Sequence, residues 1–330
     1  MSSLPTVAPP PSKPEAPLQS VQPGGGWCVK LELAWGRFRR WWLRRFHKDY
    51  VARLTAKRRG QCEACPGQTQ GCRHDVIDPR DLKFFRNVCG YHFDSADDPF
   101  RWREDLGLAR PGLGEVVIIT LAAVFLGIAL SIAGAAGMPH FLAATLGAGV
   151  FGLWAFLVLF FRDPKRTIPS DPALLVSPAD GKITDIGEID DPTFVSGKAL
   201  RISIFLSVLN VHVNRAPRAA RVTGLRYFPG KYLNAMRALS AIENEQLWID
   251  FEDSATGQPL RVKQIAGAIA RRIVCHLRPG DQVSAGERFG MIKVGSRTEV
   301  FLPATLVGEV LVKIGQTVRG GSSALLRIKS

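Results

Sequence analysis

The sequence predicts a mainly β protein, with a barrel-sandwich-like domain that has one or two helices, preceded by a transmembrane hairpin of two helices. Residues 116–161 contain no Asp, Glu, Lys or Arg. Because a bilayer-spanning helix needs about 20 apolar residues, this run is long enough for two passes. After residue 162 the chain changes to short β-branched runs that end at Asp-Gly, Pro-Gly and Gly-Asp pairs, a pattern typical of antiparallel strands.

The N-terminal part divides by composition into a tail and a basic segment. Residues 1–29 are rich in Pro, Ser and Gln and lack apolar periodicity, which predicts a disordered Pro-rich tail. Residues 30–60 are strongly basic, and aromatic side chains are interleaved with the arginines. These aromatic residues are Trp35, Phe38, Trp41, Trp42 and Phe46. With an apolar hairpin following, the pattern favours a helix on an anionic membrane surface over a nucleic-acid site, and we expect no nucleic-acid partner.

Residues 61–110 form a Cys-rich segment. Its cysteines are Cys62, Cys65, Cys72 and Cys89. In a segment on the cytoplasmic side, disulfides are disfavoured, and a C-x2-C pair followed by further cysteines indicates a metal site. Zinc or an iron-sulfur cluster would fit thiolate ligands, with zinc preferred for a short, loop-rich segment. The alternative is a set of unligated or redox cysteines.

Residues 114–161 are expected to form the transmembrane hairpin, with its turn at residues 137–140. Basic residues lie before the first helix and after the second, and the turn contains none. By the positive-inside rule, the domains on both sides of the hairpin are cytoplasmic, which predicts an inner-membrane protein with residues 162–330 on the cytoplasmic side. The alternative is a helical hairpin buried in a soluble protein.

Residues 162–330 carry the predicted β domain and one helix around residues 233–245. A weak repeat, G-x-x-V-x-x-G, occurs at residues 280–286 and 315–321. It resembles the half-motif of lipoyl and biotinyl domains, although no lysine sits at a hairpin tip as a swinging-arm carrier requires. Within the apolar run 289–303, the pair Gly295-Ser296 interrupts an otherwise strand-like pattern. The pair indicates either a bulge or turn, or a place where the backbone itself reacts.

Five motifs in this region together resemble one enzyme family. They are "FFRDPKRTIP", "SPADGKI", "LNVHVNRAP", "QIAGAIARRIV" and "GERFGMIKVGSRTEVFLP". In this order, and directly after a membrane hairpin, they resemble the short, membrane-anchored phosphatidylserine decarboxylases, which are pyruvoyl-dependent proenzymes. The resemblance extends over roughly residues 115–328. It implies a phospholipid substrate, conversion of phosphatidylserine to phosphatidylethanolamine, and a homo-oligomer of cleaved two-chain units.

The resemblance also implies what Gly295-Ser296 does. In this family the serine hydroxyl attacks the preceding glycine carbonyl, and the chain is cut between the two residues, here between Gly295 and Ser296. Ser296 then becomes the pyruvoyl group, which forms a Schiff base with the substrate amine and accepts the electrons released by decarboxylation. A second Gly-Ser pair, Gly321-Ser322, would release only a short fragment and is disfavoured as the cleavage site.

Further site residues follow from the same resemblance. His212 is the candidate base, and Asp180 is the candidate carboxylate that orients it. Asn244, Glu245 and Arg215 are candidate substrate-binding residues. The longer bacterial enzymes carry two histidines three positions apart, whereas this chain has His212 and then Arg215. Taken alone, each of these positions also fits an ordinary turn, strand or helix end.

A second function remains open at this point. The chain could be a non-enzymatic, membrane-tethered β-domain adaptor or scaffold, in which a metal-binding N-terminal segment recruits a partner and Gly295-Ser296 is a bulge. The two functions differ in one observable, because only the enzyme is cut into two chains.

Overall fold

The computed structural model describes residues 26–61, 77, 81, 101–268, 272–293 and 295–329, which form two compact units. The helices are α1 (Gly26–Phe46), α2 (Lys48–Gln61), η4 (Arg101–Leu106), η5 (Arg110–Gly112), α4 (Leu113–Ala135), α5 (His140–Phe160), α6 (Ser240–Glu243) and η6 (Ala304–Leu306). The strands are β1 (Leu174–Val176), β2 (Gly181–Asp190), β3 (Lys198–Leu206), β4 (Val213–Arg215), β5 (Ala220–Phe228), β6 (Gln246–Asp253), β7 (Pro259–Ile265), β8 (Ile273–Cys275), β9 (Gln282–Val283), β10 (Arg288–Ile292), β11 (Ser296–Pro303), β12 (Val307–Val310), β13 (Thr317–Val318) and β14 (Ala324–Ile328).

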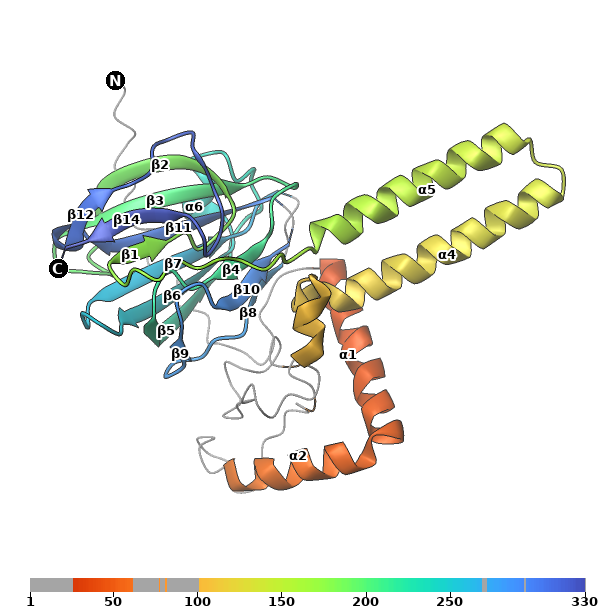
Figure 1. Cartoon of the computed structure of the whole chain (residues 1–330), viewed down its shortest axis with the longest axis horizontal. Coiled ribbons are helices and arrows are strands. Elements are labelled where there is room, and N and C mark those ends of the chain that lie inside the picture. The colour runs from red at the N-terminus through yellow and green to blue at the C-terminus, as the bar shows by residue number, and fades with distance from the viewer. Residues whose placement is uncertain are drawn as a thin grey trace. The chain divides into compact units, whose positions relative to one another are not determined.

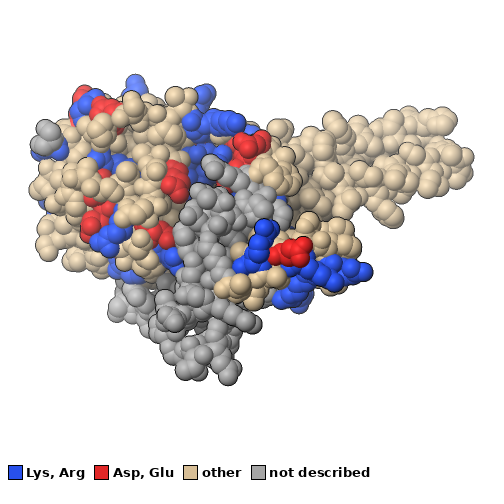
Figure 2. Space-filling model, turned by 60° about the horizontal axis from the view of Figure 1, so that its bottom comes forward, with Lys and Arg blue, Asp and Glu red and all other residues tan. Residues whose placement is uncertain are grey.

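The apolar region forms a helical hairpin in the unit of residues 99–164. Helices α4 and α5 lie side by side and are joined by a turn that contains Gly137 with φ +106° (Figure 1). Trp154 Nε1 donates to Thr120 Oγ1 at 3.1 Å and so links the two helices. Both helices are long and apolar enough to cross a membrane, and their surface carries no charged side chains in Figure 2. The hairpin predicted from the sequence is therefore present.

The basic segment folds into α1 and α2. Since α1 begins at Gly26, the last residues of the predicted disordered tail are helical. One side of α1 is buried at helical spacing, through Glu32, Gly36, Arg39 and Leu43. Large apolar side chains on the same helix are exposed, namely Leu31, Phe38, Trp41, Trp42 and Phe46. The helix is thus amphipathic, with aromatic side chains outward.

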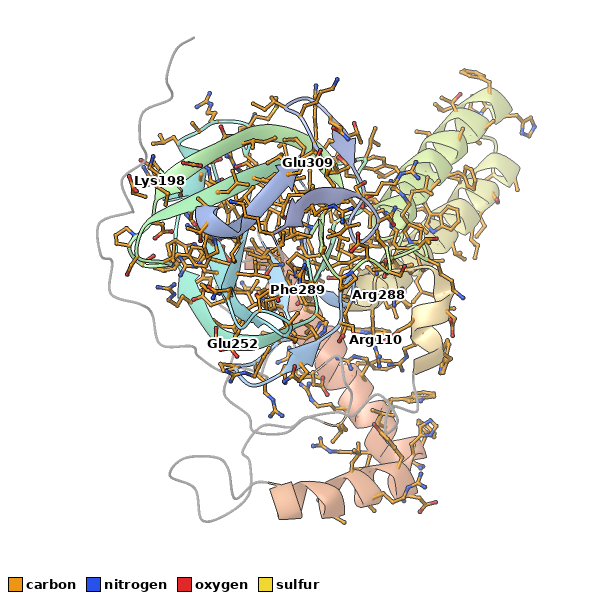
Figure 3. The ribbon with its side chains drawn as sticks, turned by 60° about the vertical axis from the view of Figure 1, so that its left-hand side comes forward. Arg110, Lys198, Glu252, Arg288, Phe289 and Glu309 are labelled. Carbon is orange, nitrogen blue, oxygen red and sulfur yellow. The ribbon has the colours of Figure 1, made fainter. Side chains whose placement is uncertain are left out.

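The β domain is built on an antiparallel sheet of eight strands in the order β13-β2-β3-β11-β7-β6-β5-β9. The sheet curls into a half-barrel (Figure 1), with two three-stranded sheets, β1-β14-β12 and β4-β10-β8, beside it. Branched apolar side chains from the central strands form the core, including Ile202, Ile204, Ile249, Val262, Val300 and Leu302. Figure 3 shows Phe289 of β10 in the interior, whereas Lys198 and Glu252 lie at the periphery. The predicted mainly β fold is confirmed in this curled form.

The opposite face of the central strands carries charged side chains that are also buried. The Nζ of Lys263, in β7, lies 3.7 Å from the ring centroid of Trp248 and 3.6 Å from Asp191 Oδ2. Burial lowers the pKa of Lys263 to about 8. On the adjacent β11, Arg297 Nε donates to Glu299 Oε1 at 2.8 Å. This side of the sheet is therefore held by ion pairs and by cations packed on the rings of Trp248 and Phe301.

The helix predicted around residues 233–245 is wrong in extent, because only Ser240–Glu243 is helical. Polar side chains form hydrogen bonds with backbone groups that a longer helix would use for its own hydrogen bonds. Asn234 Oδ1 accepts the Met236 N–H at 3.0 Å, and Asn244 bonds both the N–H and the carbonyl of Leu233 at 2.8 Å. Such local side-chain bonds compete with helix formation, which explains the short helix.

The repeat detected in the sequence has a structural counterpart. The frame at residues 280–286 contains β9, and the frame at residues 315–321 contains β13. These two-residue strands form the two ends of the eight-stranded sheet. The repeated frame therefore supplies both edge strands of this sheet.

Candidate active site

Gly295-Ser296 lies where the chain passes from one sheet to another. Strand β10 ends at Ile292 in a three-stranded sheet, and β11 begins at Ser296 in the centre of the eight-stranded sheet, opposite Leu206. Gly295 has φ +58°, a left-handed conformation that glycine adopts without steric cost. The pair is therefore neither a bulge within one strand nor a hairpin turn, but the corner between two sheets.

The carbonyl of Gly295 is approached closely by another glycine. A Cβ added to Gly267 would lie 2.0 Å from Gly295 O and 3.3 Å from Ala235 Cβ. No side chain fits there, so the position requires glycine. The backbone after β7 is thereby packed directly on the carbonyl of the Gly295-Ser296 bond.

His212 contacts Gly295 at its backbone N–H, one residue before the nitrogen of the Gly295-Ser296 bond. Its ring is fully buried, and its Nε2 accepts the Gly295 N–H at 3.2 Å. Its Nδ1 lies 2.9 Å from Asn210 O. Since a carbonyl only accepts and a backbone N–H only donates, the proton belongs on Nδ1, and Nε2 carries the free electron pair. His212 is thus held in one tautomer with its basic nitrogen at Gly295.

The hydroxyl of Ser296 is buried without a hydrogen-bond partner among the described residues. Leaving a buried polar group unsatisfied costs about 1–3 kcal/mol. Folded proteins rarely retain such a group without a reason, and a reactive role is one. The orphaned Oγ, the tautomer of His212 and the glycine-only space at Gly267 together make Ser296 suited to backbone chemistry and to conversion into a small carbonyl group.

The prediction that Asp180 orients His212 is wrong for this geometry. Arg166 Nη2 donates to both carboxylate oxygens of Asp180, at 2.9 and 2.8 Å, and Gly320 N–H donates to Oδ1 at 2.7 Å. The orienting acceptor of His212 is instead the carbonyl of Asn210. Asn210 itself is fixed by the N–H and hydroxyl of Ser207, each 2.8 Å from its Oδ1. Asp180 therefore links the Arg166 side chain to the backbone of Gly320.

Asn244 and Glu245 lie next to each other and are both buried. The Asn244 side chain bonds the backbone of Leu233 and, at 2.6 Å, the carbonyl of Ala266. Its two amide hydrogens are thus already used, which favours a structural role over substrate binding. Glu245 accepts the hydroxyl of Tyr232, and burial raises the pKa of its carboxyl group.

Arg215, the third candidate for substrate binding, is buried at the end of β4. Its Nη1 donates to Gly286 O at 3.0 Å, and its N–H donates to Pro178 O at 2.9 Å. Arg215 thus lies three residues after His212, and both of these hydrogen bonds are made to backbone carbonyls.

The predicted metal site lies outside the described residues, because Cys62, Cys65, Cys72 and Cys89 are not among them. Within the described ranges, no group of three or more His, Cys, Asp or Glu side chains could hold a metal ion. The metal site of the Cys-rich segment therefore stays a prediction.

Sequence reasoning missed residues whose roles depend on long-range contacts. Asn210 and Gly267 fall within the quoted motifs "LNVHVNRAP" and "QIAGAIARRIV". Gly267 approaches the Gly295 carbonyl and Asn210 contacts the His212 ring, but spacing along the chain gave no sign of either contact. The motifs themselves were the only signal that could have found them.

Comparison with known proteins agrees with this geometry. A family model described as phosphatidylserine decarboxylase matches residues 153–325. The chain is 44% identical over 247 residues to a phosphatidylserine decarboxylase proenzyme of Rhodopirellula baltica, covering 74% of this chain and 98% of that protein. It is 46% identical over 184 residues to the proenzyme of Carboxydothermus hydrogenoformans, covering 56% of this chain and 85% of the relative. It is 47% identical over 176 residues to the phosphatidylserine decarboxylase proenzyme of Salinibacter ruber, covering 53% of this chain and 76% of that protein.

Proposed function

The chain belongs to the phosphatidylserine decarboxylase family and is a decarboxylase proenzyme, and on this basis we propose that it cuts itself between Gly295 and Ser296 to become a pyruvoyl-dependent enzyme. The substrate is phosphatidylserine and the product is phosphatidylethanolamine. The observation that carries the proposal is the contact of His212 Nε2 with the Gly295 N–H, beside a buried Ser296 hydroxyl without a partner. Membership of an enzyme family also overturns the adaptor or scaffold alternative.

Self-cleavage begins at the Ser296 hydroxyl. Its oxygen attacks the Gly295 carbonyl carbon, so that an ester forms while the peptide C–N bond breaks and the nitrogen of Ser296 becomes an amine. Loss of the Cα proton and of the Gly295 carboxylate then leaves dehydroalanine. Addition of water and release of ammonia convert this residue to a pyruvoyl group at the start of the small chain.

His212 is the residue of this chain that would move the proton. The Asn210 carbonyl holds its proton on Nδ1, so the electron pair of Nε2, which accepts the Gly295 N–H, lies next to the bond that is cut and can take a proton there. A hydroxyl is a weak nucleophile until a base takes its proton, which makes a neutral, oriented imidazole at Gly295 the group required. Asp180 supports the site at a distance, through its bonds to Arg166 and Gly320.

The residues around Ser296 fit a pyruvoyl group. Its carbonyl supplies a place for the electron pair that remains when the substrate carboxylate leaves as carbon dioxide. The chain holds the reacting position at the start of a central strand, between β3 and β7, where it is fully buried. We propose Arg215 and Glu245 as residues that contact the substrate head group.

The proposed location is the cytoplasmic leaflet of the inner membrane. The hairpin α4–α5 would anchor the chain, and the exposed aromatic and arginine side chains of α1 would lie on the anionic surface where the substrate resides. The β domain would then face the cytoplasm, as the basic flanks of the hairpin favour. We expect the cleaved units to form a homo-oligomer.

Intact mass spectrometry of the full chain tests the proposal. We expect wild type to give two chains, of which the smaller begins at residue 296 and carries a blocked terminus of pyruvoyl mass. Ser296→Ala removes the nucleophile and should stay as one chain. Its matched control is Ser322→Ala, at the second Gly-Ser pair, which should be cut like wild type. An uncut wild-type chain would refute the proposal.

A further inference from the structure

A buried carboxylate from helix α1 meets two cations of the β domain. Arg272 Nε donates to Glu32 Oε2 at 3.3 Å, and Lys293 Nζ donates to Glu32 Oε1. The side chains of Glu32 and Arg272 are 1% exposed, and that of Lys293 is 6% exposed. Charged groups are buried in proteins almost only when they are paired. The triplet is therefore a specific contact rather than an incidental surface ion pair.

Lys293 belongs to the stretch of backbone that leads into the bond proposed to be cut, and Arg272 is hydrogen-bonded to that stretch. Lys293 lies three residues before Ser296, and its N–H donates to Arg272 O at 3.0 Å. The preceding N–H, of Ile292, donates to the carbonyl of His212 at 3.2 Å. One short stretch of chain thus contacts the Glu32 carboxylate, the backbone of His212 and the Gly295-Ser296 bond.

Glu32 reaches this stretch from outside the part of the chain that the family model matches, which is residues 153–325. It lies on the buried side of α1, four and seven residues before the buried Gly36 and Arg39. Farther along α1, Arg39 and Arg40 each bond Asp81 at 3.0 Å. The helix is thereby held at two points, and at one of them Glu32 binds the segment next to the cut.

We propose that Glu32 is a positioning residue for maturation: by pairing with Arg272 and Lys293, it holds residues 293–296 where His212 contacts Gly295. The inference rests on the self-cleavage proposed above. Without the carboxylate, two buried cations of like charge lose a shared partner, and the segment shifts to separate or hydrate them. Because backbone cleavage requires a defined approach of hydroxyl to carbonyl, even a small shift slows it.

The test follows maturation of the full chain made by cell-free synthesis into lipid nanodiscs. The fraction converted to two chains is measured against time on denaturing gels, and each rate is divided by the folded, protease-resistant fraction. We expect Glu32→Gln, which keeps the shape but removes the charge, to mature at least about tenfold more slowly than wild type. Glu32→Asp keeps the charge but withdraws it by one methylene, so its maturation rate should lie between those of wild type and Glu32→Gln.

The matched control is Asp253→Asn, which removes another buried carboxylate that is paired with an arginine, Arg218, outside the site. It should mature at the wild-type rate per folded molecule. Equal rates for wild type and Glu32→Gln would overturn the inference. A second pair of results would also overturn it: Glu32→Gln does not fold, and Glu32→Asp matures at the wild-type rate. The Glu32 carboxylate would then serve folding only. If wild type itself stays uncut, like Ser296→Ala, the proposed function fails and takes the inference with it.

Discussion

Substitution of Gly267 by alanine tests the geometry of the Gly295-Ser296 bond most directly. The new Cβ would lie 2.0 Å from Gly295 O, whereas Cβ atoms essentially never approach another heavy atom closer than 3.0 Å. The two atoms must therefore move apart by about 1 Å, and a displacement of this size between reacting groups can cost about 100-fold in rate. We expect Gly267→Ala to lengthen the half-time of self-cleavage by about this factor.

The assay is the same time course of one chain becoming two, and Gly187→Ala provides the control. Gly187 lies in β2, and a Cβ there would meet nothing within 4 Å. Both variants lose a glycine from the β domain, but only Gly267→Ala disturbs the carbonyl of Gly295. If Gly267→Ala and Gly187→Ala mature equally fast, the close approach does not position the bond, and the reasoning is refuted.

Three further predictions concern the base, a buried lysine and a buried amide. His212→Gln removes the base at Nε2 and should slow self-cleavage by about 10² to 10⁴-fold, followed by the same gel assay; an unchanged rate would exclude His212 as the base. Burial lowers the pKa of Lys263 to about 8, from 10.5 when unfolded, so the folded state binds fewer protons between these values. The free energy of unfolding should therefore rise from pH 8 to about 10.5, by about 3 kcal/mol more in wild type than in Lys263→Met. Thermal unfolding of both proteins across this pH range would measure the difference. Asn244→Leu leaves buried backbone groups of residues 233 and 266 without partners and should destabilise the fold by about 2 kcal/mol or more, and normal stability with lost activity would instead indicate substrate binding.

Features with a local signal were predictable from the sequence. The hairpin follows from a run without charges, and the strands follow from β-branched residues between turn pairs. The family resemblance picked out Gly295-Ser296 and His212, which the fold brings together although they are far apart in the chain. In each case the signal lies within a few residues.

Features that depend on which partner a side chain finds were not predictable. Asp180 pairs with Arg166 rather than with His212, and the carbonyl of Asn210 takes its place. A sequence shows that a carboxylate is present, but not which of several cations or imidazoles it meets after folding. Glu32 illustrates the same limit, since it is one of two acidic residues among eleven Lys and Arg in residues 30–59, and this pattern does not show which cations it meets.

The position of Ser296 at the first residue of β11 has a consequence for the matured protein. A cut there frees a small chain, residues 296–330, whose first strand is hydrogen-bonded along its length to β3 and over five residues to β7, both in the large chain. Its later strands β13 and β14 pair with β2 and β1, again in the large chain. The two products of maturation thus share two of the three sheets, the eight-stranded one and β1-β14-β12. They should separate only when the whole domain denatures, so the scission is an irreversible chemical event without any physical dissociation.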